Sequence, residues 1–235
     1  MSKRTSYSRG VKAMNYLYAI RLTDLSWPDL VKYLNIIPLS EQQKISQLRF
    51  DDDKLRSLLG KLLLFYVLKK HHDDQTNTLP AIRYHQYAKP YLEKLEGGFN
   101  ISHSGEWIVC LYNPYGVVGV DIEKTQPIDI NDYREVLTLT EYNAIKNGLL
   151  DFIQLWTLKE AIIKADGRGF YLAPNSFEIP LPFENHTKLD LADHSWFIAL
   201  FDFSTDYSLA IASMTDTQQT SIQTVDIESL VQKLL

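Results

Sequence analysis

This sequence has few of the residues that cross-link a protein or anchor it in a membrane. Its one cysteine, Cys110, excludes an intramolecular disulfide, and the apolar run around it favours a buried, reduced thiol. No Cys/His cluster has the spacing of a zinc site. No apolar run approaches the roughly 20 residues needed to cross a bilayer, and the basic start lacks a signal-peptide core. We therefore expect a cytoplasmic protein with no membrane partner.

Positive charge is also scarce. The chain has 24 Lys and Arg against 29 Asp and Glu, a formal net charge of −5. Such a chain does not bind nucleic acid through bulk charge, so we expect no nucleic-acid partner. Any polyanionic ligand must instead be held by a local cluster of basic groups. The 235 residues, 45% of them hydrophobic, suit one large globular domain or two small ones.

Hydrophobic periodicity predicts an α+β fold in two halves. In the first half we expect a strand over 15–22, a short helix from Ser26, a helix capped by the Ser40/Gln43 pair, a long helix over 51–70, and strands over 82–87, 99–104 and 107–112. In the second half we expect a strand over 117–124, helices near 140–147 and 151–165, a hairpin over 196–202 and 207–214, and a last helix over 227–234.

The turn residues at 113–116 are the best candidate for a midpoint between the halves. We expect a polar N-terminal extension over 1–13, an N-terminal subdomain over 14–115 and a C-terminal subdomain over 116–235. Each subdomain would pack a long helix on a small antiparallel sheet, which suggests a duplicated topology.

Two acidic side chains share one face of the strand predicted over 117–124. Asp121 and Glu123 alternate with Val120 and Ile122, so the acids point one way and the apolar residues the other. Gly119 leaves the acidic face without a side chain beside them. Adjacent like charges disfavour each other unless a cation or a proton neutralises them. The pair therefore favours a hard divalent metal ion.

The helix predicted over 151–165 carries a third carboxylate. Asp151 is a candidate N-cap, and Gly167 lies where a C-terminal stop is expected. Glu160 and Lys164 share a face at the edge of the apolar stripe, so this helix can bring Glu160 towards the acid pair. Three carboxylates favour Mg²⁺ or Mn²⁺. The alternative is an exposed strand end and a solvated helix face.

Two segments are candidates for binding phosphate. Ser102 and His103 lie near the end of a strand, where hydroxyl, imidazole and backbone N–H groups can accept a phosphate. Lys89 lies on a stiff extended turn, because Pro90 restrains the residue before it. The alternatives are a polar strand end and a solvated turn lysine.

Four other charged residues carry weaker signals. Arg56 and Lys61 lie on the long helix, where most such side chains are solvated, and Lys44 is weaker still. Glu141 fits a first-turn acid at the positive end of a helix.

Five strings occur in a characteristic order: RSLLG at 56–60, KPY at 89–91, FNISHS at 99–104, GVDIEK at 119–124 and WTLKEAIIKADGRG at 156–169. Together they resemble the 4′-phosphopantetheinyl transferases, specifically the surfactin-synthetase-activating type. The resemblance implies a pseudo-twofold α+β fold with the active site in the cleft between the halves. It also implies transfer of the phosphopantetheine arm of coenzyme A to a serine of an apo acyl or peptidyl carrier protein, with release of 3′,5′-ADP.

The resemblance implies a role for each candidate residue. Asp121, Glu123 and Glu160 would hold Mg²⁺, or Mn²⁺, against the pyrophosphate. Glu160 would act as base on the serine, and Lys164 and Asp121 would complete the catalytic group. The coenzyme A-binding residues would be Lys44, Arg56, Ser57, Lys89, Ser102, His103 and Lys164.

The residues alone leave two other functions open. A Mg²⁺-dependent phosphohydrolase uses the same carboxylates and basic groups, and a degenerate carrier-binding module is a non-enzymatic alternative. The sequence does not indicate which carrier protein is served or whether acylated coenzyme A is accepted. The length favours a monomer that supplies both halves of the cleft.

Overall fold

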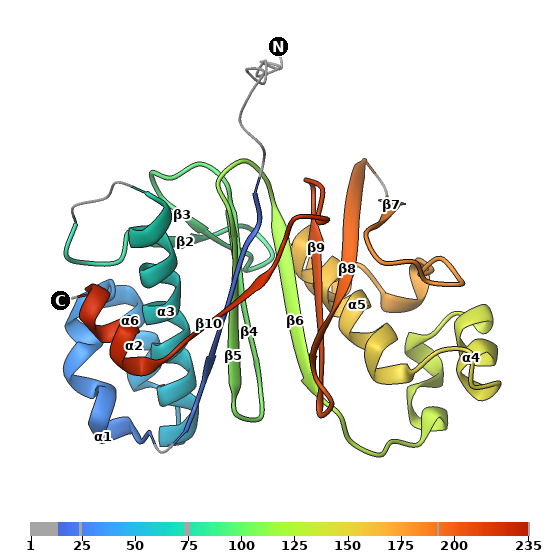
Figure 1. Cartoon of the computed structure of the whole chain (residues 1–235), viewed down its shortest axis with the longest axis horizontal. Coiled ribbons are helices and arrows are strands. Elements are labelled where there is room, and N and C mark those ends of the chain that lie inside the picture. The colour runs from blue at the N-terminus through green and yellow to red at the C-terminus, as the bar shows by residue number, and fades with distance from the viewer. Residues whose placement is uncertain (1–13, 24, 73–75, 192, 235) are drawn as a thin grey trace, which may run out of the picture.

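The structure, a computed structural model, describes residues 14–23, 25–72, 76–191 and 193–234 as two β-sheets between two long helices (Figure 1). Across the molecule the layers are α3 (Asp51–His71), a first sheet, a second sheet and α5 (Phe152–Asp166). The predicted α+β class is confirmed. The predicted extension over 1–13 lies outside the described residues.

The elements follow the predicted order closely. The first half contains β1 (Tyr16–Arg21), α1 (Trp27–Leu30), a 3-10 helix (Val31–Ile36), α2 (Leu39–Ser46), α3, β2 (Ile82–Tyr84), β3 (Pro90–Leu92), β4 (Gly98–Ser104) and β5 (Trp107–Asn113). Next come β6 (Val118–Lys124), a 3-10 helix (Ile130–Val136), α4 (Leu139–Lys146), α5 and short 3-10 helices at Gly169–Tyr171 and Pro174–Ser176. The chain continues through β7 (Thr187–Leu191), β8 (His194–Ser204), β9 (Tyr207–Ser213), β10 (Ile222–Val225) and α6 (Ile227–Leu234).

The first sheet is not purely antiparallel, and it is not built from the first half alone. Its order is β10-β1-β5-β4, and β10 pairs parallel to β1 with Leu17 opposite Ile222. The next element, α6, buries Leu230 and Leu234 in the core that contains α3 (Figure 1). Residues 222–234 therefore pack with the first half, although the predicted C-terminal subdomain included them. An amphipathic pattern shows that a helix has an apolar face, but not which distant core receives it.

The second sheet has the order β6-β9-β8-β7 and is antiparallel throughout. Its central hairpin, β8 and β9, confirms the predicted one. The edge strand β6 carries the predicted acid pair and lies beside β4, the edge strand of the first sheet. A separate hairpin, β2 and β3, leads into the KPY segment.

The inner strands β1, β5 and β9 are buried on both faces, which explains why they are mostly apolar. In β1, Tyr18 faces the core under α3, whereas Leu17 faces the second sheet. The core between the two sheets is formed by Leu17, Ala19, Val109, Leu111, Val118, Val120, Ile122, Ala199, Leu209 and Ile211. None of the described helices has the length and apolar character of a membrane span.

Local chemistry sets the ends of α5 as predicted. The Asp151 side chain accepts a hydrogen bond from the Gln154 backbone N–H, and Gly167 ends the helix with φ of 86°. The predicted Ser40 cap is wrong: α2 begins at Leu39 after Pro38 and has no side-chain cap.

α5 lies directly on β6 because Gly119 has no side chain. A Cβ at this position would lie 2.1 Å from the Ala161 carbonyl oxygen and 2.4 Å from the Ala165 backbone nitrogen. Both are backbone atoms, which cannot turn aside as a flexible side chain can. The close approach fixes the spacing between the acids of β6 and the side chains of α5.

We expect Gly119→Ala to lower the free energy of unfolding by about 1–3 kcal/mol or more, because α5 must shift away from β6. Urea denaturation followed by circular dichroism measures the change. Gly116→Ala is the matched control, since its Cβ would meet only side-chain atoms at 3.6 Å. Equal stability of the two variants would contradict the close contact at Gly119.

Candidate active site

Asp121 is the centre of a charged cluster between β6 and α5. Its side chain is 3% exposed, and its Oδ1 lies 2.5 Å from Lys164 Nζ. The Ser102 hydroxyl of β4 donates to the same oxygen at 3.0 Å, and Lys164 Nζ also lies 3.1 Å from the Ser102 oxygen. The other carboxylate oxygen, Oδ2, is buried and has no hydrogen-bond partner. One oxygen of this carboxylate therefore has two partners, and the other can still accept a further donor or cation.

Glu123 and Glu160 add negative charge beside Asp121. The Ser104 hydroxyl donates to Glu123 Oε2 at 3.2 Å, and Glu160 lines a cavity of about 240 Å³ together with Lys164. Burial raises the pKa of both glutamates, and the charge of Asp121 raises it further. Three carboxylates thus face one ammonium group, so the cluster favours an additional cation.

In this conformation the acids do not surround one point. Among the described residues, no three His, Cys, Asp or Glu side chains are grouped in a geometry that holds a metal ion. The Lys164 ammonium lies against Asp121 instead. Whether Asp121, Glu123 and Glu160 coordinate a metal therefore stays a prediction.

Polar side chains of β4 join the two halves along β6. Asn100 Oδ1 accepts a hydrogen bond from the Val120 backbone N–H at 2.9 Å. Two residues further along β4, the Ser102 hydroxyl donates to Asp121. At the end of the strand, Ser104 accepts from the Lys124 N–H at 3.0 Å. We call Asn100, Ser102 and Ser104 the β4 ladder. It replaces the backbone pairing that two edge strands otherwise make.

The β4 ladder changes the interpretation of the 100–104 segment. The Ser102 and Ser104 hydroxyls bond the acid cluster, so they position Asp121 and Glu123 rather than standing free for a phosphate. His103 points the other way and lines a second cavity, of about 300 Å³. Burial lowers the pKa of His103, and nearby Arg56 lowers it further.

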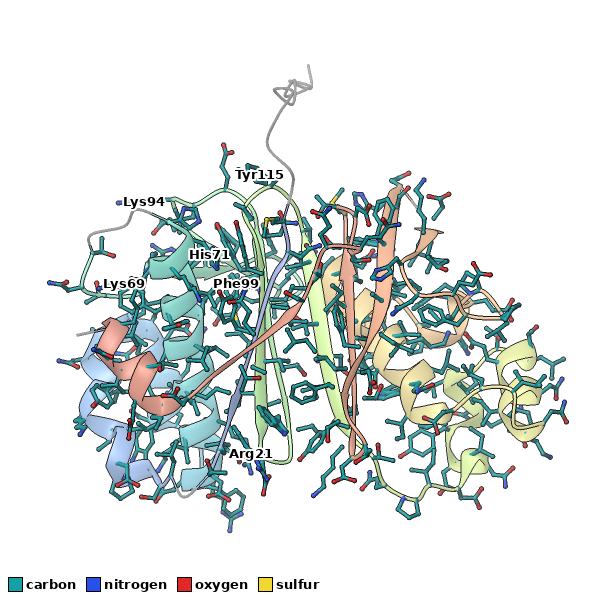
Figure 2. The ribbon with its side chains drawn as sticks, viewed as in Figure 1. Arg21, Lys69, His71, Lys94, Phe99 and Tyr115 are labelled. Carbon is teal, nitrogen blue, oxygen red and sulfur yellow. The ribbon has the colours of Figure 1, made fainter. Side chains whose placement is uncertain are left out.

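The second cavity gathers several of the predicted nucleotide-binding residues on the α3 side of β4. It is lined by Arg56, Ser57, Gly60, Lys61, Ile82, Tyr84, Pro90, Phe99, Asn100, Ile101 and His103. Pro90 and Asn100 also line the cavity that contains Glu160 and Lys164, so the two cavities adjoin. Phe99 lies in the upper part of the first half (Figure 2). Lys44 does not line the cavity: its ammonium bonds Glu41 at 2.9 Å.

Lys89 binds protein backbone rather than standing free at the turn. Its Nζ donates to the carbonyl oxygens of Val118, Lys164 and Ala165 at 3.1, 2.5 and 2.6 Å. Burial lowers the pKa of Lys89 to about 7, whereas nearby Asp166 opposes this shift. The three carbonyls favour the ammonium form, because only that form has three N–H donors. Lys89 therefore clamps the first half to β6 and to the end of α5. It also lines the cavity that contains Glu160 and Lys164, and its contact with coenzyme A stays a prediction.

Comparison with known proteins identifies the family of the chain. Residues 117–212 match the 4′-phosphopantetheinyl transferase superfamily, and residues 26–114 match the 4′-phosphopantetheinyl transferase N-terminal family. The chain is 31% identical over 186 residues to a 4′-phosphopantetheinyl transferase of Bacillus subtilis, an alignment that covers 75% of this chain and 82% of that protein. This chain is a 4′-phosphopantetheinyl transferase.

Two further relatives support the assignment to the surfactin-synthetase-activating type. The chain is 29% identical over 215 residues to the transferase Sfp of Bacillus subtilis strain 168, covering 88% of this chain and 95% of Sfp. It is 39% identical over 133 residues to the transferase gsp of Aneurinibacillus migulanus, covering 54% of each chain. The resemblance of the five strings is thus confirmed, and the chain is a transferase enzyme.

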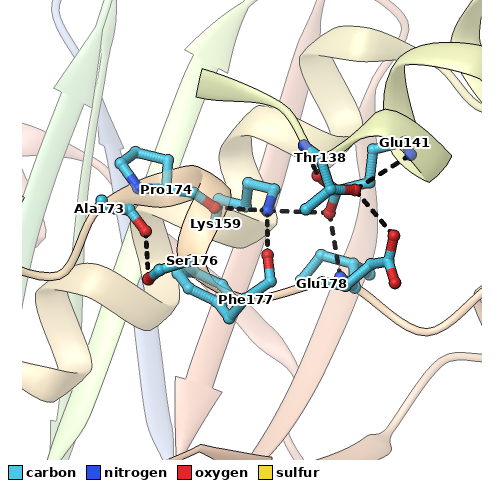
Figure 3. Close-up of polar contacts among 9 residues, drawn as sticks. Thr138, Glu141, Lys159, Ala173, Pro174, Ser176, Phe177 and Glu178 are labelled. Atoms are coloured by element: carbon cyan, nitrogen blue, oxygen red, sulfur yellow. Dashed lines mark hydrogen bonds and ion pairs between the residues drawn. The ribbon is translucent and has the colours of Figure 1, made fainter. Parts of the chain in front are cut away.

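The transferase contains a buried ion pair that the sequence did not reveal (Figure 3). Lys159 of α5 and Glu141 of α4 are both fully buried, with Lys159 Nζ 2.8 Å from Glu141 Oε1. Lys159 also donates to the carbonyls of Pro174 and Phe177 at 2.8 Å each. Glu141 in turn accepts from the Thr138 N–H at 3.0 Å. This network ties α4 and the 174–177 segment to α5, one residue before Glu160.

The sequence predicts for Glu141 only the role of an acid in the first turn of a helix. Glu141 does complete a capping box with Thr138, but it serves the ion pair as well. The spacing from Thr138 to Glu141 predicts the cap, whereas nothing local indicates a partner eighteen residues away. The place of Lys159 in the sequence was a signal, because it lies four residues after Leu155 and three before Ile162, on the apolar side of the helix.

We expect Lys159→Met to destabilise the transferase by about 3–5 kcal/mol, because Glu141 is left buried and unpaired. Urea denaturation measures the loss. The double variant with Glu141→Gln removes the stranded charge, so it should recover part of the stability. A single variant within about 1 kcal/mol of the parent protein would contradict a buried charged pair.

We expect Lys89→Met to lower the free energy of unfolding by at least about 2 kcal/mol without any ligand present, because three carbonyls lose their donor. Thermal and urea denaturation of the ligand-free protein measure it. Lys94→Met, at an exposed lysine nearby in the sequence (Figure 2), is the control and should change stability by less than about 0.5 kcal/mol. Unchanged stability with weakened coenzyme A binding would show that Lys89 binds ligand rather than clamping the halves.

Proposed function

We propose that this transferase moves the 4′-phosphopantetheine group of coenzyme A to a serine of an apo acyl or peptidyl carrier protein, with Mg²⁺ or Mn²⁺, and releases 3′,5′-ADP. One observation carries the proposal: the buried Asp121 oxygen without a partner, in a cluster of three carboxylates beside Lys164. Family membership supplies the transferred group, and the cluster supplies a site for a charged phosphate and its metal.

The residues present fit a hard divalent cation. Asp121 Oδ2 is the free ligand atom, and burial together with the charge of Asp121 raises the pKa of Glu123 and of Glu160, so a cation beside these acids would be favourable. Carboxylate oxygens are the ligands that Mg²⁺ prefers, together with water and phosphate oxygens. We assign Asp121, Glu123 and Glu160 to hold the metal, which supplies positive charge to the pyrophosphate when bound.

Glu160 and Lys164 have distinct tasks in the proposed reaction. Glu160, whose pKa is raised by burial, accepts the proton of the attacking serine hydroxyl, directly or through a water. The serine oxygen forms a bond to the phosphorus of the phosphopantetheine group. The bond from that phosphorus to the bridging oxygen breaks, and 3′,5′-ADP leaves with the electron pair. Lys164 binds a phosphate oxygen and stabilises the growing negative charge.

The adjoining cavities support a binding mode for coenzyme A. The cavity with Glu160 and Lys164 suits the pyrophosphate, and the cavity with Arg56, Ser57 and His103 suits the nucleotide end. The ligand would pass over Pro90 and Asn100, which line both. Because one chain supplies both cavities, the enzyme is proposed to act as a monomer.

We expect Glu160→Gln to keep the fold and to lower the transfer rate by at least about 100-fold, because the base is lost. Mass spectrometry of an apo carrier protein, incubated with coenzyme A and Mg²⁺, measures the gain of one phosphopantetheine group. Glu96→Gln, at an exposed glutamate, is the matched control and should transfer normally. A Glu160→Gln enzyme with a near-normal rate would exclude this role.

The same assay with the unaltered enzyme separates the proposed function from its alternatives. Carrier protein that gains one phosphopantetheine group supports transfer. Coenzyme A cleavage without carrier modification would instead support a phosphohydrolase. Stable carrier binding with neither reaction would support a binding module.

A further inference from the structure

A surplus of positive charge surrounds the buried carboxylate of Glu41, on α2. Glu41 is 1% exposed, and two lysines approach it: Lys44 Nζ lies 2.9 Å from Oε1, and Lys61 Nζ lies 3.5 Å from Oε2. The Tyr84 hydroxyl lies 3.0 Å from both carboxylate oxygens and donates to them. One carboxylate thus serves two ammonium groups, and the cluster keeps one net positive charge.

The two lysines are not equally satisfied. Lys44 is half exposed, forms the shorter ion pair, and lies 3.5 Å from the centre of the Tyr84 ring as a cation–π contact. Lys61 is only 15% exposed, and its close contact besides Glu41 is the Ser57 hydroxyl oxygen at 3.1 Å. Burial lowers the pKa of Lys61, although Glu41 opposes this shift. Lys61 is mostly buried and shares the Glu41 carboxylate with Lys44, so an added anion would stabilise its ammonium group.

Lys61 faces a cavity that suits an anion. It lines the cavity of about 300 Å³ with Arg56, Ser57 and His103, and none of the described lining residues is an Asp or Glu. Arg56 adds a second cation, since its only close acidic neighbour in the described structure is the half-exposed Asp53 at 3.4 Å. Ammonium, guanidinium and hydroxyl donors therefore converge on this space.

We infer that Lys61 binds the phosphate on the ribose of coenzyme A, and that Glu41 holds this lysine at the cavity. The inference rests on the proposed function. Coenzyme A carries phosphate in two places, and the pyrophosphate is assigned to the cavity of Glu160 and Lys164. The ribose phosphate is then left for the adjoining cavity, which Lys61 lines. Lys61, expected from the sequence to be solvated, thus becomes a specificity-determining residue of the nucleotide end.

Calorimetric titration with 3′,5′-ADP and with 5′-AMP tests this role, because the two probes differ only in the ribose 3′-phosphate. The unaltered protein should bind 3′,5′-ADP more tightly than 5′-AMP. Lys61→Met should weaken 3′,5′-ADP binding about tenfold, the effect of one lost charged hydrogen bond, and leave 5′-AMP binding unchanged. Lys69→Met, on the same helix and away from the cavity (Figure 2), should behave as the parent protein.

A Lys61→Met protein that keeps the full preference for 3′,5′-ADP would overturn the inference, as would equal weakening of both probes. Circular dichroism checks that the Lys61→Met variant is folded. If it is not folded, the titrations are repeated with Lys61→Gln, which keeps a donor for the Ser57 hydroxyl. Carrier modification is measured separately. Failure of the proposed transfer is seen in that assay, and failure of the Lys61 assignment is seen in the titrations.

Discussion

The contact between β4 and β6 is the constraint on which the candidate site depends. These are edge strands of two different sheets, and side chains rather than backbone pairs join them. Asn100 fixes the register by accepting the Val120 N–H, and Ser102 and Ser104 then meet Asp121 and Glu123. A shift of the two halves along this line would separate each hydroxyl from its carboxylate. The halves are thus aligned by the same atoms that orient the acids.

Three lysines around α5 show how one residue type serves different purposes according to its acceptors. Lys159 satisfies a buried carboxylate and two carbonyls, so it fixes the helix within the second half. Lys89 comes from the first half and bonds carbonyls at the C-terminal end of α5, where the helix dipole favours a cation. Lys164 lines the same cavity as Lys89, but its ammonium is paired with Asp121, an acid whose other oxygen has no hydrogen-bond partner. Lys164, whose acceptor is only partly satisfied, is the lysine to which the proposed reaction assigns a phosphate contact.

The sequence predicted the features that depend on local periodicity and capping. Alternation in β6 placed Asp121 and Glu123 on one face, and Asp151 and Gly167 marked the ends of α5 correctly. The buried partners could not be predicted in this way. Lys61 meets Glu41 from another helix, and the environment of either residue depends on how α2 packs on α3. The pairing of β10 with β1 is a similar case, because strands so far apart in sequence carry no signal of their register.

The pairing of β10 with β1 has a consequence for the synthesis of the protein. β1 needs β10 as its parallel neighbour, and the residues of β10 are made some two hundred residues later. While the nascent chain emerges from the ribosome, the first sheet lacks one edge strand, and the backbone donors and acceptors of β1 stay open. The first half therefore completes its sheet only after the second half has been translated, so the two halves are finished together although their helix-and-sheet layers look separate.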